Sequence, residues 1–463
     1  MAEKLTNEQQ AAVDSRERSL LVSAAAGSGK TKVLVERLFS YVEREGANLD
    51  DFLIITYTRA AASELRGKIA KALTERMERD PANYHLRQQM LRVYRADIKT
   101  VDAFCTALLR ENCHLLGEDA RGHALRPDFR VLDENEAQVL RERVLARTLD
   151  DFYDCLTPGG TLLADTLGAG RDDSALEDLV LELHAKLQAQ PYEDKWLEAQ
   201  RAFWRAVPDK IENTPYGKIL LNEVRRKARH CKNLLQRAAQ EMCANDALNQ
   251  KYAPAFLDAS YQLEALEGKT AEGWDAARGV TIAFPRLAAV KDSDGGEMKA
   301  RMKSLWDNCK ETVKGFAEIF SASSDEAVED LRTMASAMLA LIDLTADFSR
   351  RYNEEKRRRN SADFSDQEHE AIRLLIGEDG APTELARIVS ARYREIMVDE
   401  YQDTNEVQNR IFDAISCKGE NLFTVGDVKQ SIYRFRLADP RIFLQHYNCL
   451  LYTSPSPRDG ATS

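Results

Sequence analysis

The 463-residue sequence has no long hydrophobic run, no paired cysteine motif and no excess of positive charge. No window approaches the roughly 18 uninterrupted apolar residues of a membrane-spanning helix. Residues 1–8 show no basic segment followed by an apolar one, so we expect no signal peptide and a cytoplasmic location. The eight cysteines include no Cys-x-x-Cys pair. We therefore expect reduced thiols and no structural zinc.

The net charge of −11 argues against a protein that coats nucleic acid through bulk basicity. It leaves room for a local DNA groove, because phosphate contacts need only a few well-placed donors. The 44% apolar and 30% charged content is that of ordinary globular protein, and the length suits two to four domains.

Short β-branched runs occur near both ends of the chain, and each leads into a turn or a helical pattern. This arrangement predicts an α/β fold with a parallel sheet, with strands at 19–23, 52–56, 98–101, 395–398 and 421–425.

Between these ends, apolar residues recur at the three-to-four spacing of helices. We therefore predict one α/β domain formed by 1–125 and 386–448, interrupted by a mainly helical insertion at 126–385. The final segment, 449–463, has no hydrophobic period and resembles translated sequencing-adapter sequence, so we expect it to be unstructured.

The sharpest local signal is AAAGSGKT at 24–31, which follows an apolar run and opens a helical pattern. In a P-loop, small residues let backbone N–H groups surround a phosphate at a helix N-terminus, a lysine reaches the β- and γ-phosphates, and a hydroxyl binds Mg²⁺. The pattern departs from the usual motif where Ala24 replaces glycine, and the alternative is a plain strand-to-helix turn. The predicted nucleotide-binding residues are Ala24, Ala25, Ala26, Gly27, Ser28, Gly29, Lys30 and Thr31.

A P-loop that hydrolyses ATP needs acidic residues at the end of another strand. The apolar run at 396–398 is followed by Asp399, which can hold Mg²⁺ together with Thr31, and by Glu400, which can orient or deprotonate the attacking water. An apolar run followed by Asp-Glu is weak by itself. Its continuation to DEYQDTN at 399–405 makes the signal strong.

DEYQDTN resembles motif II of superfamily 1 helicases of the UvrD and RecB type. LTNEQQAAV at 5–13 is similar to the Q motif of that family, which implies that Gln9 pairs with adenine; the alternative is a surface helix start capped by Asn7. VGDVKQSIYRFR at 425–436 resembles motif III. This resemblance implies that Gln430 senses the γ-phosphate, that Arg436 contributes to the nucleotide site, and that Tyr433 and Phe435 touch DNA.

Two further segments resemble DNA-contacting motifs of the family. TYTRAAASEL at 56–65 is similar to motif Ia, which implies DNA contacts from Tyr57, Thr58 and Arg59. Base stacking on an aromatic ring contributes about 1–3 kcal/mol, but Tyr57 could equally be a core residue. TVDAFC at 100–105 resembles the Thr-x-His-Ser-Phe motif, which implies contacts from Thr100 and Phe104, whereas a carboxylate at Asp102 would repel phosphate.

Within the family, the segments 362–369, 428–429 and 434–440 resemble the AddA branch. The resemblance implies a RecA-like domain that uses ATP and Mg²⁺, moves 3′ to 5′ on single-stranded DNA, and acts at double-strand ends with an AddB-like subunit in recombinational repair.

Nothing after Pro440 resembles the motifs of a second RecA-like domain or the nuclease of that branch. Since arginines from such a domain speed related reactions by about 10³–10⁵, we expect this chain to bind Mg·ATP weakly and hydrolyse it slowly. Two alternatives remain open at this stage: a non-catalytic P-loop DNA-binding or regulatory half-motor, and an SMC/RecN-like repair ATPase. The lack of sustained heptads in the middle argues against the latter.

Overall fold

The computed structural model describes residues 5–16, 19–25, 27–119, 121–167, 174–291, 296–417, 419–427 and 440–453. The chain divides into two compact units. The sheet unit comprises residues 1–155, 172–197 and 344–463, and the helical unit comprises 156–171 and 198–343. The limits 126–385 that we gave the helical insertion remain a prediction.

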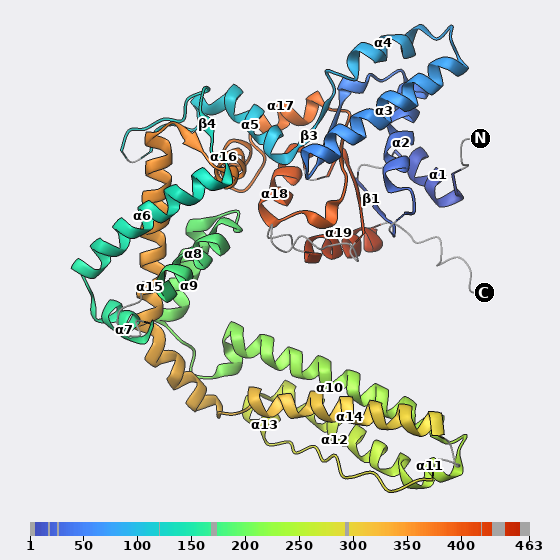
Figure 1. The fold of residues 1–463 in the computed structure, drawn as a ribbon, viewed down its shortest axis with the longest axis vertical. Coiled ribbons are helices and arrows are strands. Elements are labelled where there is room, and N and C mark those ends of the chain that lie inside the picture. The colour runs from blue at the N-terminus through green and yellow to red at the C-terminus, as the bar shows by residue number, and fades with distance from the viewer. Residues whose placement is uncertain are drawn as a thin grey trace. The chain divides into compact units, whose positions relative to one another are not determined.

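The sheet unit is built on five parallel strands, at the positions that the sequence predicted to within one residue (Figure 1). Their order in the sheet is β1-β7-β6-β2-β3. Because all strands run the same way, each connection must cross over the sheet, and helices make those crossovers. The strands are β1 (Ser19–Ser23), β2 (Phe52–Thr56), β3 (Asp97–Thr100), β6 (Glu395–Val398) and β7 (Leu422–Gly426).

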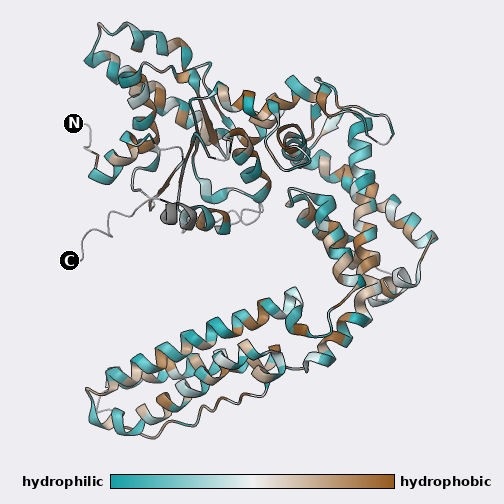
Figure 2. Cartoon of the chain, turned by 180° about the vertical axis from the view of Figure 1, so that it is seen from behind, coloured by the Kyte–Doolittle hydropathy of each residue, from teal (hydrophilic) through white to brown (hydrophobic). Residues whose placement is uncertain are grey.

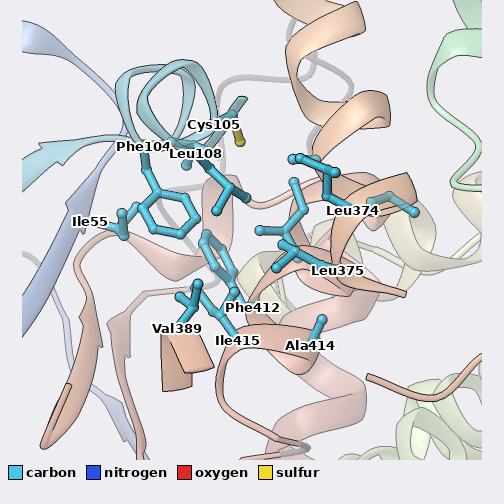
Figure 3. Packing of buried hydrophobic residues seen from close by; sticks show 14 of the residues in the cluster. Ile55, Phe104, Cys105, Leu108, Leu374, Leu375, Val389, Phe412, Ala414 and Ile415 are labelled. Atoms are coloured by element: carbon cyan, nitrogen blue, oxygen red, sulfur yellow. The ribbon is translucent and has the colours of Figure 1, made fainter. Parts of the chain in front are cut away.

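Helices cover both faces of this sheet. Successive strand residues point to opposite faces, so Ile54 and Met397 pack with α2, α3 and α4, while Ile55 and Val398 pack with α5, α16, α17 and α18. Figure 3 shows the second layer, where Phe104 lies among side chains from these helices. The helices around the sheet are α1 (Asn7–Asp14), α2 (Lys30–Glu45), α3 (Arg59–Arg79), α4 (Tyr84–Arg92), α5 (Val101–Asn112), α16 (Phe364–Leu375), α17 (Glu384–Arg392), α18 (Glu406–Ile415) and α19 (Pro440–Thr453), with short 3-10 turns η1 (Leu49–Asp51), η2 (Cys113–Leu115) and η5 (Tyr401–Asp403).

The sheet unit also holds a short parallel pair, β4 (Arg130–Val131) with β5 (Ser361–Ala362). The residues described between these two strands are helical or irregular, as the three-to-four spacing predicted. This part of the unit includes α6 (Glu134–Asp154) and α8 (Ser174–Gln188), and α9 (Glu193–Arg205) and α15 (Ser324–Arg358) each continue from one unit into the other.

The helical unit is held together by amphipathic helices that pack around their own apolar core. Val224, Leu235 and Leu263 are fully buried there, and the rings of Phe256 and Trp306 stack with centroids 4.8 Å apart. Figure 2 shows that its long helices carry both hydrophilic and hydrophobic residues. Its helices are α7 (Pro158–Leu167), α10 (Pro215–Met242), α11 (Asp246–Lys251), α12 (Ala253–Glu272), α13 (Trp274–Arg278) and α14 (Gly296–Ile319), with η3 (Ile211–Asn213).

The helix α19 extends to Thr453 and so includes the first five residues of the segment 449–463 that we expected to be unstructured. The burial of Ile442 and Phe443 anchors the start of this helix to the sheet unit. No described helix combines the length and the hydropathy needed to cross a membrane.

Candidate functional site

The parallel sheet brings the predicted motifs to a single edge. Ser23 pairs with Gly426, Val398 with Thr424, and Thr56 with Thr100, so all five strands end at about the same level. The segments that follow β1, β2, β3, β6 and β7 are those that the sequence singled out. Ligands of open parallel sheets bind outside the carboxyl ends of the strands, which makes this edge the candidate site.

The loop between β1 and α2 has the backbone of a phosphate cradle. Gly27 and Gly29 adopt φ of +73° and +82°, a left-handed conformation that residues with a Cβ rarely adopt. Gly29 is the N-cap of α2, and Lys30 is the first residue of that 16-residue helix. The amino-terminal N–H groups and positive dipole end of the helix face this loop, an arrangement that suits an anion.

Gln9 lies against this loop. Its Nε2 donates to the carbonyl of Ser28 at 2.7 Å, and a Cβ at Gly29 would lie 3.3 Å from the same nitrogen. Its Oε1 accepts from the N–H of Thr6 at 2.9 Å. Thr6, rather than Asn7, caps α1. The structure therefore places Gln9 against the predicted phosphate loop, while its pairing with adenine stays a prediction.

The two acidic residues follow β6 directly. Asp399 is buried, and burial together with the neighbouring charge of Glu400 raises the pKa of its carboxyl to about 6. Glu400 has φ of +54°, an uncommon conformation for a residue with a side chain. Its Oε2 lies 3.3 Å from Nζ of Lys30, a residue 370 positions away in the sequence. The fold thus brings together Lys30 and Glu400, two of the predicted catalytic residues.

Sequence reasoning did not single out Gln402, which lies next to this pair. Its Nε2 donates to Oε2 of Glu400 at 2.8 Å, and its Oε1 accepts from the backbone N–H of Asp427 at 2.8 Å. The available signal was its place inside DEYQDTN, but the motif alone does not show what the amide touches.

The residues predicted to contact DNA fall into two groups. Thr58 caps α3 and Arg59 begins that helix with an exposed side chain, so both lie at the carboxyl edge. Thr100 caps α5 and is largely buried, and its hydroxyl accepts from the N–H of Ala103. Phe104 is only 5% exposed and packs in the core on one face of the sheet (Figure 3), while its contact with DNA stays a prediction.

Tyr57 is partly buried against the same core, and its hydroxyl lies 2.5 Å from Oγ1 of Thr404. Burial raises the pKa of this phenol. These contacts favour the packing role that the sequence left open. The remaining predicted site residues, Ala26, Gln430, Tyr433, Phe435 and Arg436, lie outside the described residues.

The described residues fit Mg·ATP. The glycine backbone leaves open space next to Gly27, Lys30 supplies a cation at the helix start, and the buried Asp399 supplies a carboxylate. Hard oxygen ligands such as those of Thr31 and Asp399 suit Mg²⁺, which usually takes only one or two protein ligands beside phosphates and waters. Among the described residues, no three His, Cys, Asp or Glu side chains gather into a closed metal site.

Comparison with known proteins identifies the family of this chain. The family model for the UvrD/REP helicase N-terminal domain matches residues 5–450. The A subunit of the ATP-dependent helicase/nuclease of Acetivibrio thermocellus is 34% identical over 476 aligned residues, which cover 98% of this chain and 37% of that protein. The protein of the same name from Desulfitobacterium hafniense is 38% identical over 474 residues, covering 96% of this chain and 33% of that protein.

The chain therefore spans about a third of the length of these curated relatives. The similarity concerns only that part of each relative. The family match covers nearly the whole sequence and includes every strand of the parallel sheet. From its sequence motifs, its fold and this match, the chain belongs to the UvrD/REP helicase N-terminal domain family.

Proposed function

We propose that this chain is the first motor domain of an ATP-driven DNA helicase of the AddA type. The observation that carries the proposal is the 3.3 Å contact between Lys30 and Glu400 at the carboxyl edge of the sheet, next to a glycine loop in the P-loop conformation. The similarity to the A subunits of ATP-dependent helicase/nucleases, over 96–98% of the chain, supports it.

In this proposal the backbone N–H groups of 27–31 and the side chain of Lys30 hold the phosphates. Thr31 and Asp399 hold Mg²⁺, and Gln9 holds the adenine. When bound, Mg·ATP supplies a γ-phosphoryl group that can be transferred to water. Glu400 orients that water and accepts its proton, while Gln430 and Arg436 face the γ-phosphate.

Single-stranded DNA crosses the carboxyl edge near Thr58, Arg59 and Thr100, with Tyr433 and Phe435 as stacking residues. The wider role follows from the resemblance and from the names of the relatives. We propose that the substrate is double-strand DNA ends and that the partner is an AddB-like subunit. The helicase then processes DNA breaks for recombinational repair, and we propose that it acts in the cytoplasm.

We expect this chain to hydrolyse ATP slowly. Typical enzymes turn over at about 10 s⁻¹. Without the second-domain arginines a loss of about 10³–10⁵ leaves roughly 10⁻² to 10⁻⁴ s⁻¹. Such hydrolysis takes minutes to hours, so it is measured with the 463-residue chain in excess over γ-³²P-labelled ATP in Mg²⁺ buffer.

The test compares variants of the two central residues. Lys30→Ala should abolish binding of a fluorescent ATP analogue, because it removes the charge that meets the phosphates, while Lys32→Ala removes an equal charge two residues later on α2 and should bind normally. Glu400→Gln should preserve binding and reduce hydrolysis to a small residual rate. Equal affinity of the two lysine variants would refute the P-loop assignment. Wild-type hydrolysis no faster than that of Glu400→Gln would favour the non-catalytic half-motor.

A further inference from the structure

The side chain of Gln402 spans the gap between two strand ends of the site. Its amide nitrogen donates to Oε2 of Glu400, which follows β6, and its amide oxygen accepts from the N–H of Asp427, which follows β7. The residue is 2% exposed and lies in the 3-10 turn η5. A buried amide with both ends engaged is fixed in one orientation, because each end meets a group of the opposite kind.

The end of β7 is shaped to accept this amide. A Cβ on Gly426 would lie 2.6 Å from Oε1 of Gln402 and 2.8 Å from Cε2 of Phe443. Contacts this short do not occur for real side chains, so the close approach requires glycine at this position. The strand end and the glutamine therefore form one packed contact.

The chemistry of the contact is specific to an amide. A carboxylate at position 402 could still accept from the N–H of Asp427, but it could not donate to Glu400 and would repel it. Lys30, the cation that also contacts Glu400, is the residue that must turn toward a phosphate. The contact from Gln402 does not depend on that lysine, so it can hold the glutamate in place throughout.

We propose that Gln402 is a positioning residue for Glu400 and makes the orientation of that carboxylate depend on the position of the end of β7. The inference rests on the proposed function, in which Glu400 acts on the attacking water. Asp427 lies within the segment 425–436 that resembles motif III. A shift of the β7 end would therefore move Gln402, and with it Glu400. The rate of ATP hydrolysis would then depend on the conformation of motif III.

Two variants distinguish the contributions of the two hydrogen bonds that the amide makes. Gln402→Met keeps a similar volume and loses both hydrogen bonds, while Gln402→Glu keeps the bond to Asp427 and loses only the donor to Glu400. A misplacement on the order of 1 Å costs about 10²-fold in rate. In single-turnover assays of the 463-residue chain we expect both variants to slow hydrolysis at saturating ATP by roughly 10- to 100-fold. Their affinity for Mg·ATP should stay within about threefold of wild type.

A double-mutant comparison separates positioning from general destabilisation. If Gln402 acts through Glu400, adding Gln402→Met to Glu400→Gln should not slow the residual reaction further, because effects of residues that act as a unit are not additive. Gly426→Ala, which pushes on the amide without changing its chemistry, should lower the rate in the same way as Gln402→Met.

A Gln402→Glu rate within about twofold of wild type, or an additive double mutant, would overturn the inference while leaving the proposed function in place. A wild-type rate no higher than that of Lys30→Ala would instead overturn the proposed function, and the positioning role would fall with it.

Discussion

A buried ion pair joins the P-loop helix to the strand that carries the acidic motif. Arg37 on α2 is fully buried, and its Nε and Nη2 donate to the two carboxylate oxygens of Glu395 on β6 at 2.9 and 2.5 Å. Its Nη1 donates to the carbonyls of Ala12 and Ser15 at 2.7 and 2.6 Å, and the hydroxyl of Tyr41 donates to Glu395 at 3.1 Å. Burial lowers the pKa of the Arg37 guanidinium, but the hydrogen bonds and charge of Glu395, together with Tyr41, outweigh it and the pKa is raised.

Removing one partner of such a pair leaves an uncompensated buried charge, which costs about 3–5 kcal/mol. We therefore expect Arg37→Met to destabilise the sheet unit by that amount. Glu395→Leu should lower the free energy of unfolding less than Arg37→Met does, because the guanidinium keeps its bonds to the carbonyls of Ala12 and Ser15. The double variant should cost less than the sum of the two single variants by roughly 3 kcal/mol, since it leaves neither charge alone.

Hydrogen exchange measured by mass spectrometry suits this test, because it reports on α2 and β6 separately from the helical unit. A cost of about 3–5 kcal/mol corresponds to a loss of protection of about two to three and a half orders of magnitude, at roughly 1.4 kcal/mol per tenfold. The matched control is Arg44→Met on the same helix, because Arg44 pairs with Asp14 at 2.6 Å but both side chains are substantially exposed.

An exposed pair contributes at most about 1 kcal/mol, so Arg44→Met should change protection less than about tenfold. Equal losses of protection in Arg37→Met and Arg44→Met, or additive effects in the Arg37 and Glu395 double variant, would refute the reasoning.

Three further predictions concern single residues. Burial raises the pKa of Glu368 from 4.5 to about 7, although Gln408 donates to it at 2.7 Å, so the folded chain binds this proton more tightly than the unfolded chain. The free energy of unfolding should therefore fall on the order of 3 kcal/mol as the pH rises from about 4.5 through 7, and urea titrations should show a flatter pH dependence for Glu368→Gln. Phe104→Ala should destabilise the sheet unit by about 3–5 kcal/mol in the same titrations, whereas weaker binding of single-stranded DNA without any loss of stability would favour the predicted DNA contact over the packing role. Gly29→Ala should weaken binding of a fluorescent ATP analogue, because it strains the loop and presses on Gln9, while Gly46→Ala carries a comparable left-handed strain at φ +68° with no neighbour within 4 Å and should leave that affinity unchanged.

The local features of this protein are readable from the sequence. The five strands, the P-loop glycines and the helical middle follow from short-range rules: the period of apolar residues, the turn to a helix after a strand, and the left-handed backbone that glycine allows. The motif DEYQDTN likewise identifies the family without any tertiary information, because seven consecutive residues carry enough information by themselves.

Only the tertiary structure decides which of these features meet. The strand order β1-β7-β6-β2-β3 brings Lys30 to Glu400 across 370 positions and places Gln402 between Glu400 and Asp427. It also buries Phe104 and pairs Arg37 with Glu395. No local pattern encodes these contacts, since they depend on which strands become neighbours and on how much water the packed helices exclude.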